Sequence, residues 1–218
     1  MCQQYKNRQH GFTLVELAIV LVIIGLILAA VLKGQEMIEN AKVKNVENDM
    51  KGVVAAYYAY QDRYKAIPGD DLNAANHVNG ATIGNGDGLI QGLFNAQATP
   101  AATTAESNSF WQHERLSGFL TGNGTNPPTN AVGGVIGVQG GVTTFGMTGN
   151  VVCSSNIPWK IAQAVDTQLD DGNSDTGNIR AGAAATVGTA TTTSAVYGTG
   201  FTPSGTNTDG LHTVCQKI

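Results

Sequence analysis

The amino-acid sequence predicts an α+β protein: a long N-terminal α-helix packed on a small antiparallel β-sheet head with long Gly/Thr/Asn-rich loops. Three observations support this fold class. Residues 12–32 form an apolar run, an amphipathic pattern continues it to about residue 66, and the rest of the chain carries short apolar segments separated by glycine. We therefore expect the helix to be the largest element of the molecule.

The composition limits the classes of function. The chain has 218 residues, enough for one domain with an appendage, and its 42% apolar content is sufficient for a folded core. The net charge is −4, and after residue 66 only four basic residues stand against ten acidic ones. A duplex nucleic-acid binder needs a basic face to neutralise phosphates, so this balance argues against a nucleic-acid partner.

The apolar run at residues 12–32 contains one strongly polar residue, Glu16. As a helix it is roughly 30 Å long, which matches the hydrocarbon core of a bilayer. Lys6, Arg8 and His10 precede it without any acidic residue, so we expect the preceding segment to stay in the cytoplasm. A secretory signal predicts a shorter apolar stretch and a small-residue cleavage site, neither of which is present. A plain membrane anchor leaves Glu16 unexplained, because a carboxylate in an apolar span is costly.

The same helix continues beyond the apolar run. Its apolar residues recur at steps of three and four and form one stripe, while most charged residues lie off that stripe. The helix is predicted to end near Ala66, since Pro68 disfavours helical geometry at Ile67. Gly25 and Gly34 weaken it by about 1 kcal/mol each, so any local melting is expected between them. The stripe consists of Val46, Met50, Val53, Tyr57, Tyr60 and Tyr64.

The remaining chain predicts two short helices and a few short strands. One helix is expected at residues 107–117, and another opens at 156–158 and carries apolar side chains as far as residue 169. Residues 181–208 contain no charge and are predicted to be loops around one short strand. Strands are predicted at residues 132–138, 142–147, 150–153, 195–197 and 213–216.

The segment Gly11-Phe12-Thr13-Leu14-Val15-Glu16, followed by the apolar run, resembles the N-terminal signal of type IV pilins and pseudopilins. This resemblance implies that a prepilin peptidase cuts between Gly11 and Phe12 and that the new amine of Phe12 is methylated. It also implies that the helix waits in the inner membrane before entering a helical filament of identical subunits. There, Glu16 pairs with the Phe12 amine of a neighbouring subunit, so Phe12 and Glu16 are the predicted assembly residues.

The resemblance divides the chain into four parts. These are a leader at residues 1–11, a transmembrane and filament-core helix at 12–34, its amphipathic continuation at 35–67 and a globular head at 68–218. Three further segments, at residues 57–71, 84–88 and 169–172, resemble a recurring block of uncharacterised pilin-like proteins and bring no known chemistry.

The cysteines predict one disulfide. Cys2 lies in the leader that processing removes, which leaves Cys153 and Cys215 in the exported part. Export places them in an oxidising compartment, so we predict a Cys153–Cys215 bond, with a pair of free buried thiols as the alternative. This bond closes a loop of about 60 residues, which stabilises the fold by roughly 4 kcal/mol in the chain-entropy model.

Metal and catalytic motifs are scarce. Asp171, Asn173 and Asp175 place oxygen ligands at alternate positions, as calcium loops do, but Thr176 stands where such a loop needs glycine. Asx-turns at the end of a helix explain the same residues. We therefore predict no cofactor, with a structural calcium at Asp171, Asn173 and Asp175 as the one alternative, and no histidine spacing suggests zinc. No nucleophile or phosphate-binding motif is present, so the chain is predicted not to be an enzyme.

Together these features predict a structural pilin that forms a cell-surface filament. Its predicted partners are other copies of the same chain, prepilin peptidase and the pilus assembly machinery of the inner membrane. The first alternative is a pseudopilin of a type II secretion system, which acts in the periplasm. The second is a membrane-anchored periplasmic enzyme, and it leaves Gly11-Phe12 and Glu16 without explanation.

Overall fold

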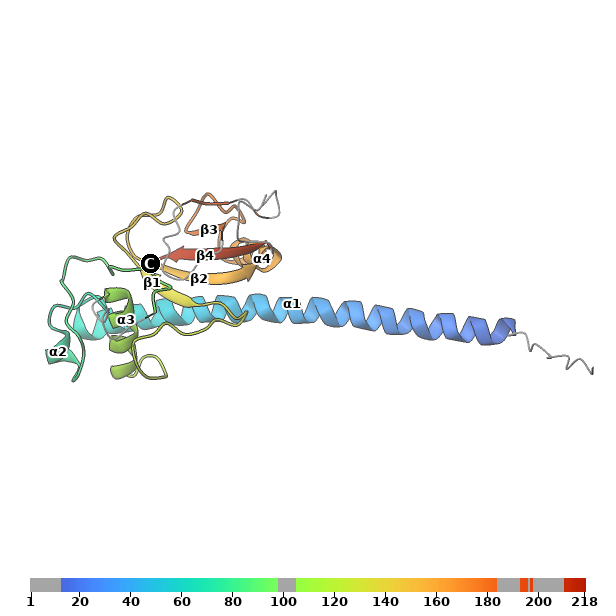
Figure 1. Ribbon diagram of the computed structural model, residues 1–218, viewed down its shortest axis with the longest axis horizontal. Coiled ribbons are helices and arrows are strands. Elements are labelled where there is room, and N and C mark those ends of the chain that lie inside the picture. The colour runs from blue at the N-terminus through green and yellow to red at the C-terminus, as the bar shows by residue number, and fades with distance from the viewer. Residues whose placement is uncertain (1–12, 98–104, 184–192, 196, 198–209) are drawn as a thin grey trace, which may run out of the picture. The chain divides into compact units, whose positions relative to one another are not determined.

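The structure is a computed structural model that describes residues 13–97, 105–183, 193–195, 197 and 210–218. The chain divides into two compact units, Met1–Asn40 and Ala41–Ile218. Helix α1, Leu14–Tyr64, supplies nearly all of the described part of the first unit and continues into the second (Figure 1). The predicted long helix is thereby confirmed, and with it the α+β fold class.

The end of α1 follows from local backbone chemistry. Lys65, the residue after the helix, has a positive φ of 57°, a left-handed conformation that helices often adopt where they stop. Pro68 follows three residues later and cannot continue the helical hydrogen-bond pattern.

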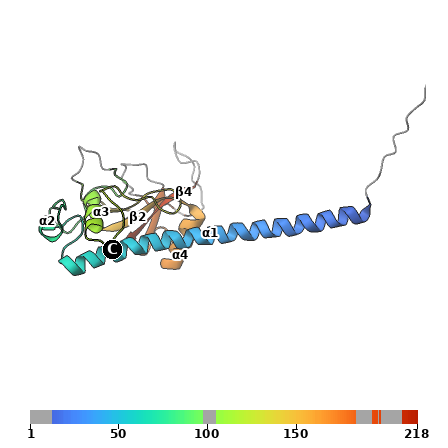
Figure 2. The ribbon, with the colours of Figure 1, turned by 90° about the horizontal axis from the view of Figure 1, so that it is seen from below.

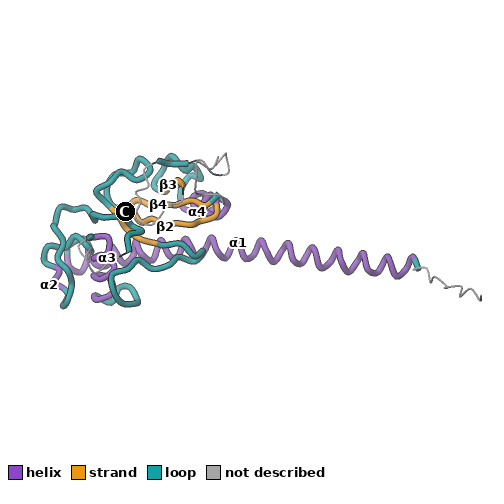
Figure 3. Tube along the Cα trace, in the orientation of Figure 1, coloured by secondary structure: helices purple, strands orange, loops and turns teal. Residues whose placement is uncertain are grey.

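The second unit contains one four-stranded antiparallel sheet with the strand order β1-β2-β4-β3 (Figure 3). The central pair, β2 and β4, places the C-terminal strand inside the sheet rather than at its edge. The strands are β1, Ile136–Gln139; β2, Val151–Pro158; β3, Ile179–Ala183; and β4, Leu211–Lys217.

Both faces of this sheet are covered. Successive strand residues point to opposite faces, so Val152 and Val214 join one core while Cys153 and Cys215 join another. The first core includes Val46, Met50, Val53 and Tyr57 of the apolar stripe, whereas Tyr60 and Tyr64 belong to a separate cluster. This part of α1 runs beside the sheet in both views (Figures 1 and 2). The second core consists of Phe94, Phe145, Met147, Val151, Cys153 and Cys215.

Three shorter helices complete the second unit: α2, Ala74–His77; α3, Glu106–Leu116; and α4, Trp159–Leu169. Helix α3 confirms the predicted helix at 107–117 and contributes Phe110 and Trp111 to the core shared with α1. Helix α4 contributes Ile161, Ala162 and Val165 to the same core. Helix α2 was not predicted from the sequence.

The predicted strand at 132–138 begins too early, because β1 starts only at Ile136. The predicted end of the 150–153 strand and the predicted start of the next helix were also wrong. Residues 156–158 continue β2, because Ile157 pairs with His212 and Pro158 pairs with Leu211, and α4 begins only at Trp159. A bulge between Ser154 and Ile157 separates these pairs from the rest of the strand, which hides its continuity in the sequence.

Other strand predictions also differ from the structure. Residues 142–147 form no strand; Phe145 and Gly146 both have positive φ values, as the centre of a tight turn between Thr144 and Met147 requires. At residues 193–195 and 197, the described part of the predicted 195–197 strand region, one isolated bridge joins Ser194 to Gly182. Strand β3 was missed because its small residues carry almost no alternating pattern.

Candidate functional site

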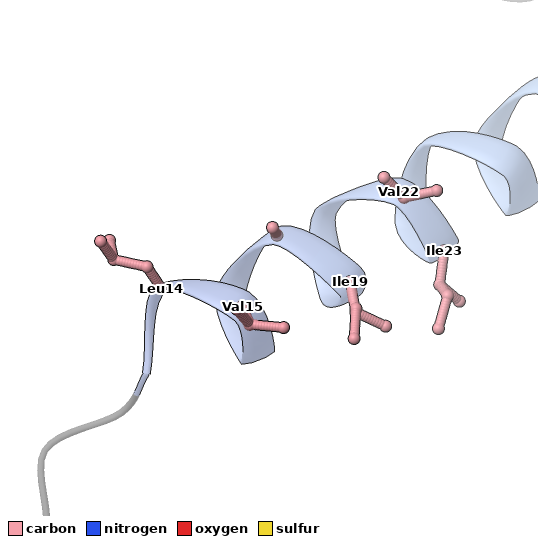
Figure 4. A pocket seen from close by; sticks show the side chains of 6 residues that line it. Leu14, Val15, Ile19, Val22 and Ile23 are labelled. Carbon is pink, nitrogen blue, oxygen red and sulfur yellow. The ribbon is translucent and has the colours of Figure 1, made fainter.

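The first part of α1 presents apolar side chains on all sides. Every large apolar side chain between Leu14 and Leu32 is between 47% and 86% exposed, and α1 is long and apolar enough to cross a membrane. A shallow apolar trough of about 400 Å³ lies along its first turns, where Val15, Ile19 and Ile23 point toward the same side (Figure 4). Burial of such surface is the main source of free energy for association, so this segment requires a bilayer or other apolar helices around it.

The start of α1 carries a reciprocal polar contact between two predicted signal residues. The backbone N–H and the hydroxyl of Thr13 both donate to Oε2 of Glu16 at 2.8 Å, and the Glu16 N–H donates to the Thr13 hydroxyl oxygen at 3.3 Å. This arrangement is a capping box, which satisfies helix donors that otherwise lack partners. It was not predicted, although the sequence carries its signature, Thr-x-x-Glu before an apolar run.

The predicted processing residues Gly11 and Phe12 lie outside the described residues, so the predicted pairing of Phe12 with Glu16 stays a prediction. Comparison with known proteins supplies the missing context. The prokaryotic N-terminal methylation motif matches residues 6–32. The chain is also 40% identical over 79 residues to the type IV narrow pilus major component PilA5 of Thermus thermophilus, an alignment that covers 36% of this chain and 68% of the relative. The chain belongs to the type IV pilin family.

The aligned region covers little more than a third of this pilin, so most of its sequence lies outside the alignment. No solved structure matches the chain. Type IV pilins are structural subunits rather than enzymes.

The predicted disulfide of the pilin is present. Cys153 of β2 and Cys215 of β4 are bonded, stand directly opposite each other with a Cα–Cα distance of 4.0 Å and are fully buried. The bond closes a loop across 62 residues of sequence and fixes the last strand of the chain to the centre of the sheet. It therefore stabilises the pairing of β2 with β4.

The acidic segment after α4 contains the predicted calcium residues. Asp171 Oδ1 accepts from the Asn173 N–H at 2.9 Å, and Asn173 Oδ1 accepts from the Asp175 N–H at 3.2 Å, so both side chains form Asx-turns. The Thr176 hydroxyl and the Asn173 N–H both donate to the Asp171 carboxylate, and these hydrogen bonds lower the pKa of Asp171. The carboxylates that approach one another within 4.8 Å here are Asp166, Asp170 and Asp171, which differ from the predicted set. Calcium binding at this segment stays a prediction.

The turn at residues 84–88 is held by two buried carboxylates that the sequence analysis did not single out. Asp70 accepts from the N–H groups of Gly86 and Gly88 at 2.6 and 2.7 Å. Glu106, at the first residue of α3, accepts from the N–H groups of Asn85 and Gln91 at 3.0 and 2.8 Å. In each carboxylate, hydrogen bonds from backbone N–H groups replace those from water. These contacts explain why both acids are buried and how the turn is held in place.

The C-terminal end of α1 packs against a network of histidine, tyrosine and aspartate side chains. The Tyr60 hydroxyl donates to Asp71 Oδ2 at 2.9 Å, and His77 Nδ1 lies 2.6 Å from the same oxygen. His113 is fully buried and accepts from the Gly69 N–H at Nδ1, so its burial lowers its pKa and favours the neutral ring. These contacts fix the segment after Pro68 to α1 and α3.

Two buried carboxylates of the pilin depart from the amphipathic pattern. Glu47 lies on the buried side of α1, where Lys44 and Lys51 reach it at 3.1 and 3.5 Å, although charged residues were predicted to lie mostly off the apolar stripe. Glu114 of α3 is fully buried, and neither carboxyl oxygen has a hydrogen-bond partner among the described residues. Burial therefore raises the pKa of Glu114 to about 8, so this carboxyl group is mainly neutral at pH 7.

Proposed function

We propose that this pilin polymerises into an extracellular type IV pilus and that the apolar part of α1 is its assembly surface. One observation carries the proposal: none of the large apolar side chains between Leu14 and Leu32 is buried by the described chain. Burying a Val, Leu or Ile side chain stabilises a protein by about 1.5–3 kcal/mol, so a segment of this length supplies a large driving force once neighbouring helices surround it.

Processing and charge pairing complete the proposed assembly route. Prepilin peptidase cuts between Gly11 and Phe12, and the subunit waits in the inner membrane until the pilus machinery extracts it. Within the filament, Glu16 pairs with the Phe12 amine of a neighbouring subunit, because either charge left unpaired among apolar helices costs several kcal/mol. The methylation motif at residues 6–32 supports this route.

The choice between pilus and pseudopilus rests on the relative. The matched Thermus protein is a major component of a narrow type IV pilus, which favours a surface filament over a periplasmic pseudopilus of a type II secretion system. The exposed head then determines what the filament contacts.

The proposal is tested on filaments sheared from the cell surface. We expect mass spectrometry to find this polypeptide as a main component, beginning at a methylated Phe12. Gly11→Ala should be processed normally, whereas Gly11→Leu should leave the leader attached and abolish filaments. A protein that is processed but stays in the periplasm would support the pseudopilin alternative, and an intact Met1 start in filaments would refute the processing route.

A further inference from the structure

The capping box at the start of α1 bears directly on the proposed assembly contact. Glu16 is the only strongly polar residue of the apolar run, and its carboxylate is bound through a single oxygen, Oε2, to two donors of Thr13 at 2.8 Å. Among the described residues, none donates a hydrogen bond to the other oxygen, Oε1. Oε2 is therefore held within the subunit. Since Glu16 is exposed, Oε1 is available to a cation from outside.

We propose that Thr13 is a positioning residue for filament assembly: it holds the Glu16 side chain in one rotamer and presents Oε1 to the amine of a neighbouring subunit. This inference rests on the proposed function. It assigns to the Thr13 hydroxyl a role in the contact between subunits, separate from its role in starting the helix.

The physical reason is the cost of orienting a long charged side chain. A free glutamate samples several rotamers, and ordering it in the filament opposes association. Hydrogen bonds to an ionised acceptor are stronger than neutral ones, so two of them from Thr13 order the carboxylate before any neighbour arrives. Both donors belong to Thr13, which follows the Gly11-Phe12 junction, so leader removal leaves them in place.

Helix capping alone is the competing explanation, and three substitutions separate it from positioning. Thr13→Ser keeps both the cap and the hydroxyl donor. Thr13→Gly keeps a helix cap to within a few tenths of a kcal/mol but has no hydroxyl, and Thr13→Val keeps the size of threonine and loses both functions. If only the cap matters, glycine behaves like serine; if the hydroxyl positions Glu16, glycine behaves like valine.

The experiment uses tagged full-length variants in cells that also make the untagged wild-type chain. The readout is the ratio of tagged protein in sheared filaments to processed tagged protein in the membrane, with mass spectrometry to confirm the Phe12 start. We expect Thr13→Ser to match the wild type, and Thr13→Gly and Thr13→Val to lower the ratio by about threefold to tenfold, the effect of losing one net hydrogen bond. A normal ratio for Thr13→Gly would overturn the proposal.

A Glu16→Ala arm distinguishes failure of this inference from failure of the proposed function. In that background, adding Thr13→Gly should cause no further loss, because the side chain that Thr13 positions is gone. If Glu16→Ala is excluded from filaments while every Thr13 variant enters normally, the assembly role of Glu16 stands and the positioning role of Thr13 is wrong. If Glu16→Ala itself enters normally, both roles are wrong.

Discussion

The two parts of α1 share one backbone and differ in where their apolar side chains find partners. Between Leu14 and Leu32 the apolar residues lie on all sides and none of them is buried. Between Val43 and Tyr60 most of them lie on one side, and eight residues of that stretch are buried within the second unit. A helix that is apolar all round requires partners outside its own chain, whereas a helix with one apolar stripe is stabilised by a single neighbouring layer.

Polar residues follow the same division. In the first part the one carboxylate, that of Glu16, is bound by Thr13 at the helix start. In the second part Glu47 is buried between two lysines, and the Tyr60 hydroxyl reaches Asp71 in the loop beyond the helix. The first part therefore has its polar contact at one end, while the second has polar contacts distributed through a core. Stability should depend on the second part and assembly on the first.

Removing the disulfide should produce the largest change in stability. Replacing Cys153 and Cys215 together by alanine should lower the free energy of unfolding by roughly 4 kcal/mol, because the loop across 62 residues is no longer closed in the unfolded chain. Denaturation of the full chain in detergent micelles, followed by the fluorescence of Trp111 and Trp159, measures this change. Cys2→Ala is the matched control and should have no effect. Loss of leader processing in the double variant would contradict the separation of the two parts.

A matched pair of methionines on α1 tests the comparison more finely. Met50 is fully buried and Met37 is 64% exposed. Met50→Ala should lower the free energy of unfolding by about 2–5 kcal/mol because it leaves a cavity in the core. Met37→Ala should change it by less than about 0.5 kcal/mol, since that side chain lies on a surface. The same fluorescence measurement applies, and equal effects at the two positions would contradict the comparison.

The smallest predicted effect concerns pH and Glu114. The pKa of this carboxyl is raised to about 8 in the folded head from an ordinary value of 4.5, so the folded state binds a proton that the unfolded state releases between these values. Stability from this group is therefore present at low pH and is lost as pH rises, by roughly 2 kcal/mol between pH 5 and pH 7. Glu114→Gln should remove this slope relative to the wild type. Parallel pH profiles of the two proteins would show that Glu114 ionises normally.

Much of the architecture was predictable because it depends on local patterns. The steps of three and four from Val46 to Tyr60 specify which side of α1 is buried, and Pro68 sets where the helix stops. The Cys153–Cys215 bond followed from counting cysteines in the exported part. The Thr13–Glu16 capping box was also readable, since it needs only a threonine three residues before a glutamate.

Long-range contacts were not predictable from such patterns. Strand β3 carries small residues whose place is decided by pairing with β4, and Asp70 and Glu106 lie buried because distant backbone N–H groups of one turn point at them. Glu47 lies outside the apolar stripe of α1 and is buried only because other segments of the second unit pack over it. The sequence by itself determined the helix, the membrane-competent surface and the disulfide partners, since these depend on neighbours in the chain or on composition. The tertiary structure alone decided which polar groups are buried, because hydration is lost only where separate segments meet.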